Sequence, residues 1–448
     1  MPFSEAPLRR PARLLPLVTA VTLAAFTALP GGAVLGVSTA DAQSSKKQPA
    51  KKNAKKKPKY TLEGELRKLQ SSKAISSRDF RDWRTLYRGT VDDARKLPKG
   101  LRRTELEAVI RNTEQIAERR KLTGSLAPSV FLTLSTNRTW WKTQPIPPVG
   151  GRPVVADSPL TWQYYRGEGL QIQWLATFGT ANALATTKTP AKLEQLRAIQ
   201  TEALRLASDR AGGPTWAYLF DFGGGAPPWS SGMAQVTGIQ SLVRTSAKLG
   251  DPSFQETGLK AMALLRREPT SGARLKMPAG DHILLYTYTR MRVMNAFAQA
   301  VSGLHEIARL TQDPQAHSAY LRAESQLRVE LPEYVTANWA TYSIGGAPET
   351  PSYHTLSRDL LRGLCRSLTA DAELFITGQP VAGLQAPADP TIYCQTAERF
   401  TLDLQRTPNG PGRSNARATS RAATPTGRSA VPADDPAATL GDPALLRP

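Results

Sequence analysis

The sequence predicts a mainly helical protein built from antiparallel helix pairs, and three observations lead to this prediction. Apolar residues recur every three to four positions over long stretches, as they do on the buried face of a helix. Asp251-Pro252 and Asp313-Pro314 each follow such a stretch and favour a new helix, because aspartate caps the first turn and proline fits within it. The two Asp-Pro pairs are about 60 residues apart, which indicates a repeated helix-turn-helix unit.

The first 42 residues have the features of a signal peptide. Basic residues between positions 9 and 13 precede an apolar run from Leu14 to Val37, and Ala40-Asp41-Ala42 shows the small-x-small pattern that signal peptidase cleaves. We therefore expect export and cleavage before Gln43. The alternative is an uncleaved membrane anchor, because the apolar run is long enough to span a bilayer.

Residues 43–59 form a lysine-rich stretch with no apolar side chain larger than alanine except two prolines. Such a segment cannot bury a core, so we expect a disordered linker that is either a tether to an acidic envelope surface or a solubilising spacer. The chain of 448 residues carries 58 Lys and Arg against 37 Asp and Glu, a formal net charge of +21, and residues 60–406 are basic without the linker. This charge favours an anionic partner such as a polysaccharide. No nucleic-acid-binding module is visible, so nucleic acid is not an expected partner.

Residues 60–160 are expected to form a small cap of helices and short strands. The apolar residues from Tyr60 to Leu122 have helical spacing. The character changes between Gly124 and Pro159, where Ser129 to Ser135 has the composition of a strand and the prolines and glycines of residues 145–151 mark a turn.

Residues 161–406 are expected to form the main helical domain. Its predicted helices carry apolar stripes over Leu193–Leu206, Met233–Val243, Phe254–Leu265, Val293–Leu310 and Leu356–Leu368, and a last helix is expected over Thr391–Leu404. Residues 407–448 are mostly small, polar, proline and arginine residues, so we expect a disordered tail.

The segment from Thr215 to Ala234 is the most informative part of this domain. Aromatic residues alternate with other residues from Trp216 to Phe222, which is typical of a short extended segment, and three glycines and two prolines then break the strand. Ser230 or Ser231 can cap a helix that starts at Gly232. A strand, a glycine turn and a helix start can form the rim of a ligand cleft. A capped, buried helix behind a loop is the alternative.

Five separated stretches between about Tyr164 and about Leu374 carry a family resemblance. They are YYRGEGLQIQWLATFGTANAL from Tyr164, WSSGMAQ from Trp229, RVMNAFAQAVSGLHEI from Arg292, LPEYVTANWATYSI from Leu331 and SYHTLSRDLL from Ser352. Taken in this order, they resemble the C-terminal domain of the D-glucuronyl C5-epimerases, with the chain as a bacterial exported member.

The resemblance implies an incomplete (α/α) toroid and an isomerase that inverts carbon 5 of uronic acid residues in an anionic, glycosaminoglycan-like polysaccharide. That reaction removes and returns a poorly acidic hydrogen next to a carboxylate. It needs a base on one face of the sugar, an acid on the other, and cationic or hydrogen-bonding groups at the carboxylate. The scheme requires no metal or redox cofactor.

Tyrosines are the acid and base residues that the resemblance implies. Tyr353, in the Tyr-His pair after Pro351, matches one family tyrosine, and Ser352 can cap the helix there. Tyr286 is the nearest match to a second family tyrosine with a one-residue gap, and Tyr288 is the fallback. The family's carboxylates before this tyrosine are replaced here by apolar residues. A tyrosine can act as a base where a neighbouring cation lowers its pKa.

Further polar and aromatic residues are candidates for substrate binding. Arginine can bind a carboxylate with two hydrogen bonds, and sugars stack on aromatic side chains. The structural alternatives are a solvated helix start for the polar residues and a place in the core for the aromatic ones. The candidates are His354, Arg290, Arg292, Asn295, Trp229, Trp339 and Tyr342, with Tyr164, Tyr165 and Trp174 as similarly placed aromatics.

Cys365 and Cys394 are the two cysteines of the chain. In an exported protein we expect them to form one disulfide, and two separate buried thiols are the alternative. The sequence shows no zinc-ligand spacing, no Walker-type phosphate loop and no dinucleotide-binding fingerprint.

Two other functions fit the same sequence features. A non-catalytic toroid could bind an envelope polysaccharide, since the acidic residues of the family site are missing. A uronate polysaccharide lyase abstracts the same proton and then expels the substituent at carbon 4.

Overall fold

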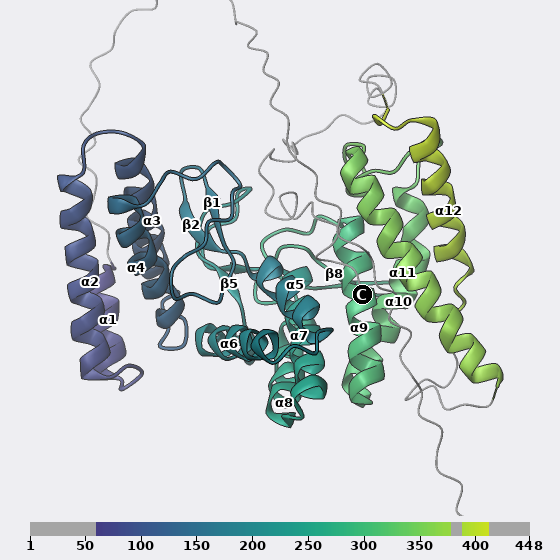
Figure 1. Cartoon of the computed structure of the whole chain (residues 1–448), viewed down its shortest axis with the longest axis horizontal. Helices are drawn as coiled ribbons and strands as arrows, with labels where there is room; N and C mark the ends of the chain where they lie inside the picture. The colour runs from purple at the N-terminus through teal and green to yellow at the C-terminus, as the bar shows by residue number, and fades with distance from the viewer. Residues whose placement is uncertain (1–59, 378–387, 412–448) are drawn as a thin grey trace, which may run out of the picture. The chain divides into compact units, whose positions relative to one another are not determined.

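Helices dominate the computed structural model, which describes residues 60–377 and 388–411 (Figure 1). Within these ranges the strands are short and form antiparallel pairs. The prediction of a mainly helical protein is therefore confirmed. The expected signal peptide, the expected lysine-rich linker and residues 412–448 of the expected tail lie outside the described residues. No helix of the described part is both long and apolar enough to cross a membrane.

The described chain begins with four helices: α1 (Leu62–Ser71), α2 (Ser77–Lys96), α3 (Leu101–Glu118) and α4 (Ala127–Thr143). Side-chain caps start the first two. The Thr61 hydroxyl accepts a hydrogen bond from the Gly64 amide, and Ser76 and Asp79 form a capping box. Helices α2, α3 and α4 pack against one another. The helical prediction for residues 60–122 is confirmed.

The predicted strand over Ser129–Ser135 is wrong, because these residues lie within α4. Pro128 fits the first turn of this helix, where no backbone donor is needed. Phe131 then stacks on Trp83 of α2 with ring centroids 4.9 Å apart. Packing of this kind against the neighbouring helices outweighs the strand preference of β-branched and aromatic residues, which depends on context.

In the described part of the chain, eight further helices alternate between an inner and an outer row. The inner row is α5 (Trp174–Ala185), α7 (Gly232–Leu249), α9 (Met294–Thr311) and α11 (Pro351–Ile376). The outer row is α6 (Pro190–Leu206), α8 (Pro252–Ala261), α10 (Pro314–Tyr334) and α12 (Thr391–Arg406). Each inner helix packs against the next inner helix and against the outer helix that follows it in the chain (Figure 1). The helix pairs that the two Asp-Pro turns predict are present as α7 with α8 and α9 with α10.

Small residues allow the inner helices to approach one another closely. A Cβ atom on Gly238 of α7 would lie 2.8 Å from Phe178 of α5, and one on Gly303 of α9 would lie 2.5 Å from Val236 of α7. A larger residue at either position would overlap its neighbour in the close-packed interior. Most of α7 and α9 is buried, whereas α10 buries one face. The core therefore follows the inner row.

The ends of the helices follow the sequence signals. Asp251 and Asp313 cap α8 and α10 with their side chains. Helix α7 ends at Gly250, which adopts a left-handed conformation with a φ of 69°. A disulfide joins Cys365 of α11 to Cys394 of α12, and this is the pair that the sequence predicts.

Short antiparallel strand pairs precede three of the inner helices. The pairs are β1 (Trp162–Tyr165) with β2 (Gly169–Ile172), β3 (Ser208–Arg210) with β4 (Gly213–Thr215), β5 (Ala217–Tyr218) with β6 (Trp229–Ser230), and β7 (Arg274–Met277) with β8 (Gly280–Ile283). Backbone hydrogen bonds join the loops before α9 and α11 to the starts of α7 and α9, respectively. The Gly232 amide donates to the Leu285 carbonyl at 3.1 Å, and the Met294 amide donates to the Tyr342 carbonyl at 3.1 Å. These segments therefore gather at the amino-terminal ends of α7 and α9.

Candidate functional site

The segment between β5 and α7 brings aromatic side chains to a helix start. Phe222 and Gly225 close a tight turn by exchanging backbone hydrogen bonds of 2.9 and 2.7 Å. The chain then enters α7 after Ser231, whose hydroxyl accepts a hydrogen bond from the Ala234 amide at 3.2 Å. This geometry confirms the predicted glycine turn and the helix start at Gly232 with Ser231 as its cap.

Trp229 is the centre of an aromatic cluster at this helix start. Its ring stacks on Tyr218 at 4.4 Å and contacts Tyr286 and Tyr288 at 5.4 and 5.5 Å. Its Nε1 atom donates a hydrogen bond to the Phe220 carbonyl at 2.8 Å. Only 1% of Trp229 is exposed, so it fastens the loop to the helix start and offers no face to a sugar. The predicted substrate contact of Trp229 is therefore corrected to a structural one.

Tyr286 and Tyr288, the candidates for the second proton-transfer group, stack on each other with ring centroids 5.3 Å apart. Tyr286 is only 5% exposed, whereas Tyr288 is half-buried. Gly225 makes room for the Tyr288 ring, since an added Cβ atom there would lie 2.3 Å from it. Tyr288 is therefore the more accessible of the two rings.

Tyr353 lies at the start of α11, as predicted, although Thr350 and not Ser352 caps this helix. Its half-buried ring meets the edge of Tyr342 at 5.1 Å. The Tyr342 carbonyl accepts the hydrogen bond from the Met294 amide at the start of α9. The starts of two neighbouring inner helices thus bring these two tyrosines together. Tyr342 is only 3% exposed, so its predicted substrate contact is corrected to a structural one.

His354 and Trp339 are enclosed by α11, α12 and the loop before α11. Their rings stack at 3.9 Å, and Phe400 lies 4.3 Å from the His354 ring. The Nδ1 atom of His354 is 3.1 Å from the Glu349 carboxylate, which also accepts a hydrogen bond from Ser357 at 2.6 Å. His354 is 0% and Trp339 2% exposed. The predicted ligand roles of these two residues are therefore corrected to roles in the core.

The polar candidates near the start of α9 have three different environments. Arg290 is exposed. Arg292 lies 3.5 Å from Glu330 and 3.4 Å from Glu333, so carboxylates of the protein itself already neutralise its charge. Asn295 is fully buried, and neither atom of its side-chain amide has a hydrogen-bond partner in the described part of the chain. Of these three, Arg290 is the side chain that a dissolved polymer can reach most directly.

A buried polar cluster that the sequence analysis missed lies beside Arg292. Glu330 of α10 accepts hydrogen bonds from Tyr334 and from Gln326, and the Nδ1 atom of His282 lies 2.9 Å from it. Burial lowers the pKa of His282, which keeps the ring neutral. Burial opposes ionisation of Glu330, but its contacts with His282, Tyr334 and Gln326 outweigh this effect and lower its pKa. The cluster holds the segment before α9 against α10.

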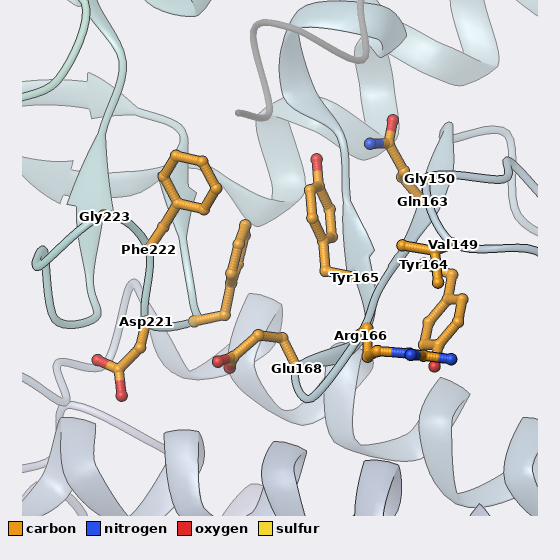
Figure 2. A pocket seen from close by; sticks show the side chains of 11 residues that line it. Val149, Gly150, Gln163, Tyr164, Tyr165, Arg166, Glu168, Asp221, Phe222 and Gly223 are labelled. Carbon is orange, nitrogen blue, oxygen red and sulfur yellow. The ribbon is translucent and has the colours of Figure 1, made fainter. Parts of the chain in front are cut away.

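A cavity of about 200 Å³ opens next to the aromatic cluster (Figure 2). The β1–β2 hairpin lines it with Tyr165 and Glu168, and the segment before the glycine turn lines it with Phe220, Asp221 and Phe222. The Tyr165 and Phe220 rings pack with centroids 4.7 Å apart. An aromatic wall and two carboxylates therefore meet in one concave site, which is the usual composition of a small-molecule pocket.

Glu168 has the most strongly altered acidity among the residues that line this cavity. The Asn112 side chain donates a hydrogen bond to its carboxylate at 2.7 Å, and the backbone amide of Asp221 donates another. Burial and the negative charge of Asp221 nevertheless raise the pKa of Glu168 to about 7, against the opposing effect of Arg111. The group can therefore hold or release a proton near neutral pH.

Neither Glu168 nor Asp221 was a candidate from the sequence, although a ligand cleft was expected at the segment that contains Asp221. A local signal was present, because both carboxylates lie within two residues of glycines that allow tight turns. Glu168 lies between Gly167 and Gly169, whose φ angles are 81° and 72°, and Asp221 precedes the three-glycine turn by one residue. No group of three or more metal-ligating side chains occurs in residues 60–377 and 388–411.

Residues 213–376 match the profile of the D-glucuronyl C5-epimerase C-terminus family. The match starts at β4 and ends at the end of α11, and it confirms the family resemblance that the separated motifs carry. No curated protein is significantly similar to the chain.

Several solved structures share a remote likeness with this chain. They include a sugar epimerase from a ruminal bacterium, with 10% identity, a TM-score of 0.36, and coverage of 52% of this chain and 59% of that one. The unsaturated glucuronyl hydrolase of Bacillus sp. GL1 has 11% identity, a TM-score of 0.37, and coverage of 52% and 61%. The cellobiose 2-epimerase of Bacillus thermoamylovorans B4167 has 13% identity, a TM-score of 0.32, and coverage of 52% and 59%. The chain thus spans less than two thirds of each of these proteins, and likenesses of this size say nothing about activity.

Proposed function

We propose that this protein is an exported enzyme similar to the D-glucuronyl C5-epimerases, which inverts carbon 5 of uronic acid residues in an anionic polysaccharide. The observation that carries the proposal is the family match over residues 213–376. The matched region includes the starts of α7, α9 and α11, where the candidate tyrosines and Arg290 lie. The basic charge of the chain is consistent with an anionic polymer as the substrate.

The proposed mechanism transfers the proton at carbon 5 between tyrosines on opposite faces of the sugar. Tyr353 is one proton-transfer group, because its half-buried ring stands at the start of α11. The second is Tyr286 or Tyr288, and the greater accessibility of Tyr288 favours it. Arg290 is exposed and is the group proposed to bind the uronate carboxylate, where negative charge grows as the proton leaves.

Two further parts of the proposal concern architecture and location. The order of contacts along the inner and outer rows supports an incomplete (α/α) toroid. Residues 1–42 support export with cleavage before Gln43. The lysine-rich stretch after them would then tether the mature protein to an acidic envelope surface or polymer.

A non-catalytic polysaccharide-binding protein is the second candidate function. The burial of Tyr286 and the pairing of Arg292 with Glu330 favour it, because both remove groups that the epimerase reaction would use. A lyase, the third candidate, differs only after the proton has been removed, when the bond to the substituent at carbon 4 breaks.

The deciding experiment is incubation of the mature protein with glucuronate-containing polysaccharides in deuterated water. Deuterium at carbon 5 without unsaturated products supports the epimerase. Unsaturated, ultraviolet-absorbing ends show a lyase, and retained binding without either product shows a receptor.

The variant Tyr353→Phe locates the activity within the protein. It keeps the ring and removes the hydroxyl, so the exchange rate should fall by about 10²–10⁴ while affinity for the polymer changes little. Tyr87→Phe is a matched control, because it removes a tyrosine hydroxyl that hydrogen-bonds Glu114 in the N-terminal helices. Full exchange activity in Tyr353→Phe would refute the role given to this tyrosine. Comparison of Tyr286→Phe with Tyr288→Phe then identifies the second group.

A further inference from the structure

The cavity between the β1–β2 hairpin and the Phe220–Gly223 segment has no part in the proton transfer proposed above. None of Tyr286, Tyr288 and Tyr353 is among the residues that line it. Its volume of about 200 Å³ is below the range of about 300–1,000 Å³ that is usual for drug-sized ligands. The cavity therefore suits a single small ring.

Two carboxylates give the cavity its hydrogen-bonding character. Asn112 holds the Glu168 carboxylate from one side at 2.7 Å, and Gln115 donates a hydrogen bond to Asp221 at 3.3 Å. A carboxylate offers about four acceptor positions, so both groups keep capacity for further donors. Figure 2 shows Glu168 reaching from the hairpin toward the segment that carries Asp221. A ligand with several hydroxyl groups would supply the donors.

Aromatic rings give the cavity an apolar wall beside these carboxylates. Tyr165 and Phe220 pack at 4.7 Å, and Phe222 continues the row with its ring centroid 6.0 Å from that of Phe220. Phe222 is half-buried, so part of its ring remains accessible. Flat aromatic surface next to hydrogen-bond acceptors suits a pyranose, which has both hydroxyl groups and an apolar face.

The charges around the cavity discriminate against an anionic ligand. Arg166 is among the lining residues, but its side chain hydrogen-bonds Tyr164 and lies beside it, away from Glu168 (Figure 2). Arg111 acts on Glu168 through its charge but is not among the lining residues, so the ligand would face the two carboxylates without a lining cation between them. The carboxylate of a uronic acid would be repelled there, whereas an uncharged sugar would not.

We propose that this cavity binds an uncharged pyranose, with the Glu168 carboxylate accepting hydrogen bonds from its hydroxyl groups and Phe222 packing against its ring, while the exposed Asp221 carboxylate, which points away from the Phe222 ring, contributes negative charge (Figure 2). The cavity borders the candidate tyrosines, because the Phe222 ring lies 5.8 Å from the Tyr286 ring, but none of the three tyrosines lines it. Binding of the sugar does not depend on the epimerase proposal being correct.

The test is a titration of the mature protein with four monosaccharides at pH 8, in which ligand-observed NMR monitors binding. Glucose and N-acetylglucosamine are the uncharged probes, glucuronate is the anionic probe and 6-amino-6-deoxyglucose, which stays protonated at this pH, is the cationic probe. Saturable binding of an uncharged sugar, with weaker binding of glucuronate, is expected. Stronger binding of glucuronate, binding of the cationic sugar alone, or no saturable binding of either uncharged sugar would overturn the proposal.

Conservative variants assign the binding to this cavity. Hydrogen bonds to a charged group contribute about 1.5–3 kcal/mol, so Glu168→Gln should weaken the binding of the uncharged sugar by about tenfold or more. Asp221→Asn removes one negative charge beside Glu168 at an exposed position, so it should reduce the discrimination against glucuronate and leave the affinity for the uncharged sugar nearly unchanged. Glu202→Gln, a matched change on α6, should have no effect. Wild-type affinity in Glu168→Gln would place the sugar elsewhere and refute the assignment.

Tyr353→Phe separates this proposal from the proposed function. Its affinity for the uncharged sugar should equal that of the wild type, even where deuterium exchange is lost. A wild-type protein without exchange activity that still binds glucose would refute the epimerase proposal alone. Loss of sugar binding in Tyr353→Phe would refute the separation of the two sites.

Discussion

Replacing Glu168 by glutamine should change how the stability of the protein depends on pH. Burial, together with the charge of Asp221, raises the pKa of this carboxyl group from 4.5 to about 7 in the folded protein. The folded protein therefore holds this proton more tightly than the unfolded chain does. The free energy of unfolding therefore falls as the pH rises from the pKa of the group in the unfolded chain to its pKa in the folded protein. The loss is complete above the pKa in the folded protein.

The expected size of the effect follows from the two pKa values. One pH unit corresponds to about 1.4 kcal/mol, so the ionised Glu168 should cost about 3 kcal/mol of stability well above pH 7 and almost nothing at pH 4. Most of this change falls between pH 5 and pH 8. Glutamine keeps an oxygen that can accept the hydrogen bond from Asn112 but carries no charge. Relative to the wild type, the free energy of unfolding of Glu168→Gln should therefore rise by about 2–3 kcal/mol between pH 5 and pH 8.

Urea unfolding at pH 5, 6, 7 and 8, with the disulfide kept oxidised, measures this difference. Titrating groups that do not interact with Glu168 affect both proteins equally and cancel when the two free energies are subtracted. Glu202→Gln on α6 is the control for the change of residue type, because Glu202 does not line the cavity. A constant difference between Glu168→Gln and the wild type across this range would refute the burial and charge effects described for Glu168.

Two further predictions concern packing and covalent structure. Gly225→Ala should destabilise the protein by about 1–3 kcal/mol in thermal unfolding, because the added Cβ atom would lie 2.3 Å from the Tyr288 ring. Gly363→Ala is the control and should be neutral or stabilising, because no atom lies within 4 Å of its new Cβ atom. Replacing Cys365 and Cys394 by serine removes a disulfide that spans 29 residues. The free energy of unfolding measured in urea should fall by about 3–4 kcal/mol. An unchanged free energy would show that the bridge does not constrain the unfolded chain.

Local sequence signals were sufficient for much of the fold. The apolar stripes predicted α6, α7, α8, α9 and α11 but not α5, and Asp251 and Asp313 predicted the starts of α8 and α10. These signals work because helix periodicity and capping involve residues within one or two turns of each other. The exception is Ser129–Ser135, where contacts with other helices outweighed the local preference for a strand.

The candidate site depended far more on contacts between distant parts of the chain. The sequence marked Trp229, Trp339 and His354 as possible ligand contacts, but neighbouring rings and carboxylates enclose all three. Aromatic residues in a core and at a binding surface have the same composition and spacing, and burial alone separates them.

By itself, the sequence determined the helical class, the paired helices, the cysteines available for a disulfide and the resemblance to an epimerase family. Only the tertiary structure decided which aromatic rings are accessible and which carboxylates meet. Asn112, Glu168 and Asp221 are far apart in the chain and come together only when α3, the β1–β2 hairpin and the segment before α7 are packed. The acidity of Glu168 follows from that meeting, because a pKa depends on burial and neighbouring charge, which three-dimensional packing sets.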